Sequence, residues 1–224
     1  MSKKIIPKQQ FKGLLIFYDF SLVTFSQRLL NPVVWPQRII KFMSIILVSD
    51  VFGVTPALLA ISEKLGACPI VDPYKGQMMG FENEAEAYSY FVKTVSLDNY
   101  LSQLLQAVEL IEHQTTLIGF SIGAAVTWRL SEIKGNYLIK QAYCFYGSQI
   151  RNFTHIEPNF EMNLVFPKSE PHFDVVELQN ILSLKANVNA ERVEYLHGFM
   201  NYYSTNYSHS GYTNYLDFLC SISR

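Results

Sequence analysis

Short apolar runs alternate with longer amphipathic stretches along most of the chain. Six of these runs have the length and the β-branched or aromatic content of buried strands, and they cover residues 43–49, 68–71, 115–118, 141–146, 162–166 and 191–196. Apolar residues at helical spacing predict helices over residues 56–65, 83–95, 98–113, 124–130 and 174–186, with a last helix ending near residue 222. The alternation predicts an α/β fold, in which a mostly parallel sheet has helices on both faces and functional loops at the carboxyl ends of its strands.

The residues that flank two of these helices support the assignment. Thr55 suits the N-cap of the first helix, Pro56 suits its first turn, and Gly66 suits the position where a helix stops. Asp174, with Glu177 three residues later, has the pattern of an N-cap with a supporting acid. A structural role is therefore expected for Asp174.

Residues 1–42 do not follow the alternation, and their basic residues are opposed by a single acid, Asp19. The apolar segment 13–18 follows a basic start, as in a signal peptide, but Asp19 interrupts it and no small-residue cleavage site follows cleanly. Three interpretations stay open: a hairpin at a sheet edge, a basic segment at a membrane surface, and an extension upstream of a translation start at Met43. We therefore divide the chain into a basic N-terminal extension, residues 1–42, and a single α/β domain, residues 43–224.

Composition excludes several classes of function. The 224 residues, 49% hydrophobic and 17% charged, describe a folded chain with a large core. A net charge of -1 gives no reason to expect nucleic acid as a partner. The three cysteines lie far apart and suit neither a disulfide framework nor a metal site. No apolar stretch approaches the roughly 18 to 20 residues that span a bilayer, so we expect a cytoplasmic protein without a transmembrane segment.

The pentapeptide from Gly119 to Gly123 is a G-x-S-x-G motif between a predicted strand and a predicted helix. In that context the motif forms a sharp, strained turn that exposes a serine at a helix N-terminus, and its glycines let the strand and the helix approach closely. As a bare pattern, it also occurs by chance in turns. With the flanking elements, it predicts that Ser121 is a nucleophile.

A serine nucleophile needs a base and an acid, which in this layout follow later in the chain, the acid first. His197 lies directly after the last predicted strand, whereas His113, His155 and His209 lie near a predicted helix end, in a loop and in a polar tail. Glu170 and Asp174 are both candidates for the acid. Because helix capping already accounts for Asp174, Glu170 is favoured.

An acyl-transfer intermediate also needs two backbone N–H groups that bind its oxyanion. One comes from the residue after the nucleophile and the other from the loop after an early strand. These residues are Ile122 and Val51.

The order of these motifs resembles the dienelactone hydrolase family of the α/β-hydrolases. The resemblance extends from about Met43 to His209 and rests on the segments 50–56, 72–74, 119–123, 145–147, 169–173 and 197–199. Three positions depart from the family pattern. Ser121 replaces the nucleophilic cysteine of the dienelactone-cleaving members, Glu170 precedes the usual acid position, which Pro171 occupies, and Asp50 replaces an early-loop glutamate. The resemblance implies hydrolase chemistry and leaves dienelactone doubtful as the substrate.

These observations predict a serine hydrolase that cleaves a small ester, lactone or thioester through Ser121, His197 and Glu170. We expect no metal and no organic cofactor. The expected partner is a small-molecule substrate, and the expected state is a monomer or a homodimer. The alternative is a non-catalytic binding or scaffold protein with the α/β-hydrolase fold, which the displaced acid position would suit.

Overall fold

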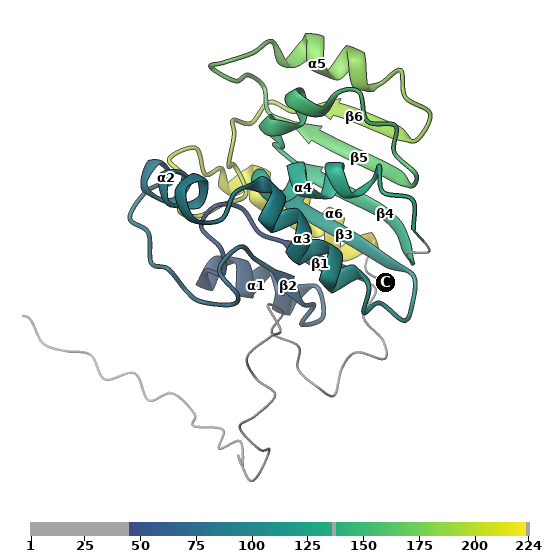
Figure 1. The fold of residues 1–224 in the computed structure, drawn as a ribbon. Coiled ribbons are helices and arrows are strands. Elements are labelled where there is room, and N and C mark those ends of the chain that lie inside the picture. The colour runs from purple at the N-terminus through teal and green to yellow at the C-terminus, as the bar shows by residue number, and fades with distance from the viewer. Residues whose placement is uncertain (1–44, 136–137, 223–224) are drawn as a thin grey trace, which may run out of the picture. The chain divides into compact units, whose positions relative to one another are not determined.

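The computed structural model describes residues 45–135 and 138–222, so the proposed N-terminal extension, residues 1–42, lies outside the described residues. The described chain forms one six-stranded sheet with the strand order β2-β1-β3-β4-β5-β6, and every neighbouring pair is parallel (Figure 1). The strands are β1 (Ile45–Val48), β2 (Ile70–Val71), β3 (Thr115–Phe120), β4 (Ile139–Phe145), β5 (Glu161–Phe166) and β6 (Val188–Arg192). The predicted α/β architecture with a parallel sheet is confirmed.

Helices cover both faces of this sheet. The helices are α1 (Pro56–Lys64), α2 (Glu84–Thr94), α3 (Leu97–Val108), α4 (Ile122–Leu130), α5 (Val175–Leu182) and α6 (His209–Ile222), and a 3-10 helix, η2, spans Ser148–Phe153. Buried residues of α3, α4 and α5 share one hydrophobic cluster, and those of α1 and α6 share a second. Figure 1 shows the α3–α4 layer and the α6 layer on opposite sides of the strands.

Strand β1 shows why the sheet is buried on both sides. Ile46 and Val48 belong to the first cluster, whereas Ile45 and Leu47 belong to the second. Successive side chains of a strand point to opposite faces, so a continuous apolar run is what a strand between two helical layers requires.

Side-chain caps mark the helix starts, at the predicted Thr55 and also at Asn83, for which no capping role was predicted. The Thr55 hydroxyl accepts a hydrogen bond from the Leu58 N–H at 3.1 Å, and the Asn83 side chain accepts one from Glu86 at 2.9 Å. Helix α1 ends just before Gly66, which has a φ of +93°. Local side-chain chemistry therefore decides where these helices begin and where α1 ends.

Two predicted helix ends are wrong. Helix α3 stops at Val108 instead of residue 113, and α5 stops at Leu182 instead of residue 186. After each helix the chain turns through tight i to i−3 hydrogen bonds, including Ile111 to Val108 and Lys185 to Leu182. The chain must turn there to enter the next strand, so His113 lies in a loop beyond the helix.

The last strand is also displaced from its predicted position. Strand β6 ends at Arg192 because its register on β5 places Val188 opposite Met162. Val193 and Tyr195, which suggested a strand up to residue 196, instead pack against the cluster of α1 and α6. His197 therefore lies in a loop beyond the strand rather than directly after it.

Helix α6 begins at His209 and ends at Ile222, the residue near which the last helix was predicted to end. None of the helices in the described ranges is long and apolar enough to cross a membrane.

Candidate active site

The turn between β3 and α4 is sharp and strained, as the motif predicts. Ser121 has a φ of 50° and a ψ of −111°, a conformation that costs free energy in a residue with a side chain. A Cβ atom at Gly123 would lie 2.3 Å from the Val48 carbonyl oxygen, and one at Gly119 would lie 2.8 Å from the Ala124 nitrogen. Glycine is therefore required at both positions for α4 to lie against β1 and β3.

The structure brings Ser121, His197 and Glu170 into one line of contacts. The Ser121 Oγ lies 3.1 Å from the His197 Nε2, and the His197 Nδ1 lies 2.7 Å from the Glu170 Oε1. The three residues come from the β3–α4 turn, the loop after β6 and the loop after β5, which meet at the carboxyl edge of the sheet. This is the arrangement that a hydroxyl nucleophile, its base and an orienting acid require.

Asp174, the competing acid, makes different contacts. Its Oδ1 accepts hydrogen bonds from the Val176 and Glu177 N–H groups at 2.8 and 3.2 Å, so it caps α5. The geometry therefore favours Glu170 as the partner of His197.

The main chain around His197 is held by the segment that follows it. The Asn206 Nδ2 and the Ser204 Oγ donate hydrogen bonds to the His197 carbonyl oxygen at 3.1 and 3.5 Å. Gly198 has a φ of +80°, and a Cβ there would lie 2.5 Å from the Ser204 Oγ. These contacts stabilise the loop conformation in which the imidazole reaches both Ser121 and Glu170.

Ser148, the first residue of η2, was not anticipated by the sequence reasoning. Its hydroxyl donates a hydrogen bond to the Glu170 Oε1 and lies 3.0 Å from the His197 Nδ1. The Arg151 guanidinium donates to the Ser148 carbonyl oxygen at 2.7 Å, which fixes this turn. The only available signal was the position of Ser148 just after a predicted strand, at the functional edge of the sheet.

Burial and charge act in opposite directions on the pKa values of His197 and Glu170. Burial lowers the pKa of His197, but the hydrogen bond and negative charge of Glu170, with the charges of Glu84 and Asp50, outweigh it, so this pKa is raised. Burial raises the pKa of Glu170, but the interactions with His197, Ser148 and Arg151 outweigh it, so this pKa is lowered. An ionised Glu170 beside His197 is the pairing that stabilises an imidazolium.

Of the residues predicted to bind an oxyanion, Val51 lies in the early loop and Ile122 follows Ser121 as the first residue of α4. The N–H groups of Val51 and Ile122 donate no hydrogen bond within the described ranges, and Val51 lines the pocket that contains Ser121. The Tyr74 hydroxyl donates to the Val51 carbonyl oxygen at 2.7 Å, and the Phe52 N–H donates to the Asp50 Oδ1 at 2.9 Å. These bonds hold the early loop and leave the Val51 N–H available.

Ser121 and His197 line a pocket, here called the outer pocket, with about 210 Å³ of empty space, part of which is open solvent. Asp50 and Glu84 line it, and no lysine or arginine among the described residues does. The Glu84 Oε1 lies 3.6 Å from the His197 Nε2, a contact that the sequence reasoning missed because α2 is distant in sequence from the other site residues. Burial raises the pKa of Asp50 to about 6. The outer pocket therefore has an acidic wall.

The other histidines that were compared with His197 as the base do not line the outer pocket. His113, His155 and His209 have no contact with Ser121 or Glu170. In the part of the chain that the structure describes, no group of three or more His, Cys, Asp or Glu side chains is arranged to hold a metal ion.

The sequence of this chain is similar to that of a curated protein. No family model matches the chain. The uncharacterized protein YczH of Bacillus subtilis (strain 168) is 27% identical over 165 residues, which cover 70% of this chain and 80% of that protein.

Several solved structures resemble the described fold. The dienelactone hydrolase-like promiscuous phosphotriesterase P91 from metagenomic libraries has a TM-score of 0.59 at 11% identity, over 81% of this chain and 85% of that one. Est1E from Butyrivibrio proteoclasticus has a TM-score of 0.56 at 9% identity, over 83% and 88% of the two chains. The dienelactone hydrolase from Anabaena variabilis ATCC 29413 has a TM-score of 0.54 at 10% identity, over 81% and 85%. Together with its parallel sheet and strained serine turn, these likenesses show that the chain has the α/β-hydrolase fold, with dienelactone hydrolase-like proteins among its structural neighbours.

Proposed function

We propose that this protein is a serine hydrolase that cleaves a small ester, lactone or thioester. The observation that carries the proposal is the unbroken line of contacts from the Ser121 Oγ through both nitrogens of His197 to the Glu170 carboxylate. A histidine that contacts a hydroxyl through Nε2 and a carboxylate through Nδ1 is held in the tautomer that accepts a proton from the hydroxyl. The names of the structural neighbours, which include a dienelactone hydrolase-like phosphotriesterase and a dienelactone hydrolase, agree with this class of reaction.

The first half of the reaction forms an acyl-enzyme. The Ser121 Oγ attacks the carbonyl carbon while its proton passes to the His197 Nε2, and the carbonyl π electrons move to the oxygen. The N–H groups of Val51 and Ile122 bind the resulting oxyanion. When the carbonyl re-forms, the bond to the leaving oxygen or sulfur breaks, and the leaving group takes the proton from His197.

The second half repeats these steps with water. His197 takes a proton from a water molecule, whose oxygen attacks the acyl carbonyl, and then returns the proton to the Ser121 Oγ as the bond to the acyl group breaks. Glu170 stays ionised throughout and stabilises the imidazolium, and Ser148 holds the Glu170 carboxylate in place. The net reaction adds one water across one ester bond.

The test is labelling with a fluorophosphonate probe, together with hydrolysis of p-nitrophenyl acetate. The wild-type protein should be labelled stoichiometrically at Ser121 and should hydrolyse the ester. Ser121→Ala should abolish labelling and lower kcat by about 10³-fold or more, with little change in the thermal midpoint. Ser102→Ala, at an exposed serine of α3 whose hydroxyl bonds only the Asp98 carbonyl, is the control and should behave as wild type.

Two results would contradict the proposal. If the wild-type protein neither reacts with the probe nor hydrolyses the ester, the alternative of a non-catalytic binding or scaffold protein is favoured. If Ser121→Ala retains turnover, the activity resides in another residue.

A further inference from the structure

Tyr146 lies directly after β4 and has an unusual backbone conformation. Its φ is +42°, in the left-handed region, which a bulky residue occupies only at a cost in free energy. The backbone is held there, because the Tyr146 N–H donates to the Val165 carbonyl oxygen at 2.8 Å and the Ser148 N–H donates to the Tyr146 carbonyl oxygen at 2.9 Å. Glycine would adopt this conformation without strain, so the presence of an aromatic side chain needs its own explanation.

The ring of Tyr146 packs against the imidazole of His197. The two ring centroids are 5.2 Å apart, and the ring planes are inclined by 54°. Tyr146 is only 1% exposed, and its ring also contacts the rings of Phe120, Phe145 and Phe199 at centroid distances of 5.4 to 6.4 Å. The tyrosine ring therefore joins the imidazole to a buried aromatic cluster, which is close-packed and resists movement.

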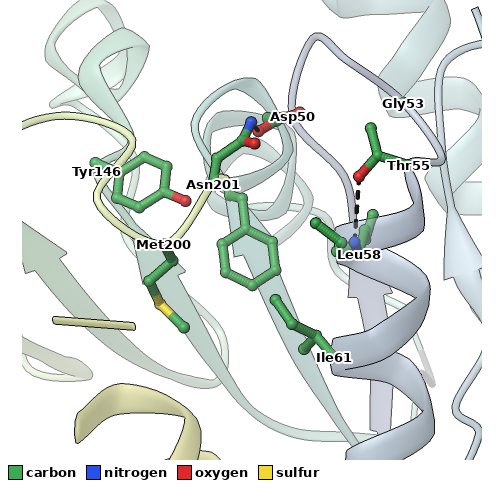
Figure 2. Close-up of a pocket in the computed structure, with 10 residues that line it drawn as sticks. Asp50, Gly53, Thr55, Leu58, Ile61, Tyr146, Met200 and Asn201 are labelled. Carbon is green, nitrogen blue, oxygen red and sulfur yellow. Dashed lines mark hydrogen bonds between the residues drawn. The ribbon is translucent and has the colours of Figure 1, made fainter. Parts of the chain in front are cut away.

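The hydroxyl of Tyr146 is not what holds this ring. It makes no hydrogen bond to any residue in the described ranges. The side chain lines a pocket together with Leu58, Ile61 and Met200 (Figure 2). Removal of the hydroxyl would therefore break no hydrogen bond within the described residues, and the contribution of the ring can be measured separately.

The proposed reaction requires one orientation of the His197 ring. Glu170 and Ser148 contact its Nδ1 at 2.7 and 3.0 Å, but contacts at one edge leave the ring free to tilt about that edge. A tilt would move the Nε2 away from the Ser121 Oγ, which lies 3.1 Å from it. A misplacement of about 1 Å can lower a reaction rate by about 10²-fold. A rigid group packed against the imidazole prevents this loss.

Resting on the hydrolase function proposed above, we propose that Tyr146 is a positioning residue for His197. Its ring limits the tilt of the imidazole and so keeps the Nε2 within reach of the Ser121 Oγ. The strained backbone at Tyr146 directs the ring to the histidine, and the same turn places Ser148 beside the His197 Nδ1. The ring acts on the histidine and not on the reacting atoms.

Replacement of the ring tests this proposal. Tyr146→Leu should lower kcat/KM for p-nitrophenyl acetate and the rate constant of fluorophosphonate labelling by about 10-fold or more, because the imidazole is no longer restrained. Tyr146→Phe keeps the ring, so both quantities should stay within about 2-fold of wild type. Tyr146→Met, with a longer and more flexible apolar chain, takes the place of Tyr146→Leu if that variant does not fold.

The extent of labelling separates positioning from folding. Each variant is labelled well below its own thermal midpoint, where the molecules are folded. Positioning predicts complete labelling with a lower rate constant, whereas a merely structural role predicts a wild-type rate constant with part of the protein unlabelled. Phe145→Leu is the matched control, since Phe145 belongs to the same aromatic cluster and has no ring contact with His197 among the described residues. It should lower the thermal midpoint and leave the labelling rate constant as in wild type.

A second pair of variants separates the ring from the strained backbone. Tyr146→Gly removes the strain of the positive φ, whereas Tyr146→Ala retains it, so the glycine variant should have the higher thermal midpoint of the two. Both variants lack the ring, so both should be labelled about 10-fold or more slowly than wild type. The more stable variant would then gain no reactivity from its stability.

A wild-type labelling rate constant in folded Tyr146→Leu or Tyr146→Met would overturn the positioning role and leave the hydrolase function standing. Equally slow labelling of Tyr146→Phe would also overturn it, because the hydroxyl and not the ring would then be responsible. If the wild-type protein is not labelled and hydrolyses no ester, the hydrolase function itself is contradicted.

Discussion

A single carboxylate contacts His197 Nδ1, although two acidic residues of the same loop region compete for that place in the sequence. Glu170 lies 2.7 Å from the Nδ1, while Asp174 caps α5. The two residues are only four positions apart, but the chain between them turns so that one faces the site and the other faces a helix N-terminus. Their substitutions should therefore affect different properties.

Glu170→Gln should lower kcat by roughly 10³- to 10⁴-fold, as the loss of an orienting carboxylate does in other triads, with little change in stability. Asp174→Ala should leave kcat nearly unchanged and lower the free energy of unfolding by about 1 kcal/mol through the lost cap. Ester hydrolysis and urea unfolding of both variants provide the measurements. If the two effects are exchanged, the acid has been assigned wrongly.

Glu84 affects the same histidine from the opposite side. Its carboxylate lies 3.6 Å from the His197 Nε2, and its negative charge is one of the causes that raise the pKa of His197, with Glu170 and Asp50. In the proposed reaction, the neutral imidazole is the form that accepts a proton from Ser121. Activity should therefore rise with pH as His197 loses its proton, and the midpoint should lie above the usual histidine value.

The rise of kcat/KM with pH is here called the acidic limb. Glu84→Gln should move the acidic limb to lower pH, because removal of a nearby negative charge makes the imidazolium less stable. The measurement is the pH dependence of kcat/KM for p-nitrophenyl acetate. Glu109→Gln, at an exposed glutamate beyond the end of α3, is the matched control and should leave the limb in place. A shift to higher pH, or equal shifts in the two variants, would contradict this account.

At the scale of elements, α4 lies so close to β1 that there is no room for a side chain at Gly123. The hypothetical Cβ at Gly123 would lie 2.3 Å from the Val48 carbonyl and 2.4 Å from that of Ser49. These are backbone atoms of a buried strand, so they cannot move aside as a flexible side chain would. The helix and the strand must separate if any side chain is added.

Gly123→Ala should therefore destabilise the protein by several kcal/mol or prevent folding, as steric overlap in a core does. Gly66→Ala is the comparison, because a Cβ there meets no atom within 4 Å and the cost is limited to the positive φ, about 1 to 2 kcal/mol. Chemical unfolding followed by circular dichroism compares the two. Equal stability of the two variants would show that α4 adjusts its position freely.

At the scale of the whole molecule, the candidate site and the sheet lie in the same continuous part of the chain. All six strands fall between Ile45 and Arg192, and the proposed catalytic residues fall between Val51 and His197. Within the described ranges, the sheet edges are β2 and β6. The site therefore depends on loops that a chain starting at Met43 would retain.

We predict that a protein starting at Met43 folds and keeps the fluorophosphonate reactivity of Ser121. Size-exclusion chromatography combined with probe labelling measures both properties, with the full chain as the control. A soluble, monodisperse and labelled protein is the expected result. If residues 11–25 instead form a hairpin that covers a sheet edge, the shortened chain would expose apolar surface and an unpaired strand, and it would aggregate.

Local sequence determined several features of this protein. The strand and helix order, the capping of α1 by Thr55, and the serine turn between Gly119 and Gly123 depend on nearby residues, because caps, glycines and apolar periodicity act within a few positions. The G-x-S-x-G motif between strand and helix is likewise a local signal.

Only the tertiary structure decided how distant parts of the chain meet. Strand β6 ends at Arg192 because pairing with β5 sets its register. The apolar side chains of Val193 and Tyr195, which suggested a longer strand, pack against the hydrophobic cluster of α1 and α6 instead. Ser148 and Glu84 contact His197 from a turn and a helix that are far away in sequence. Such contacts depend on how the loops converge at the carboxyl edge of the sheet, which no short-range pattern of residues encodes.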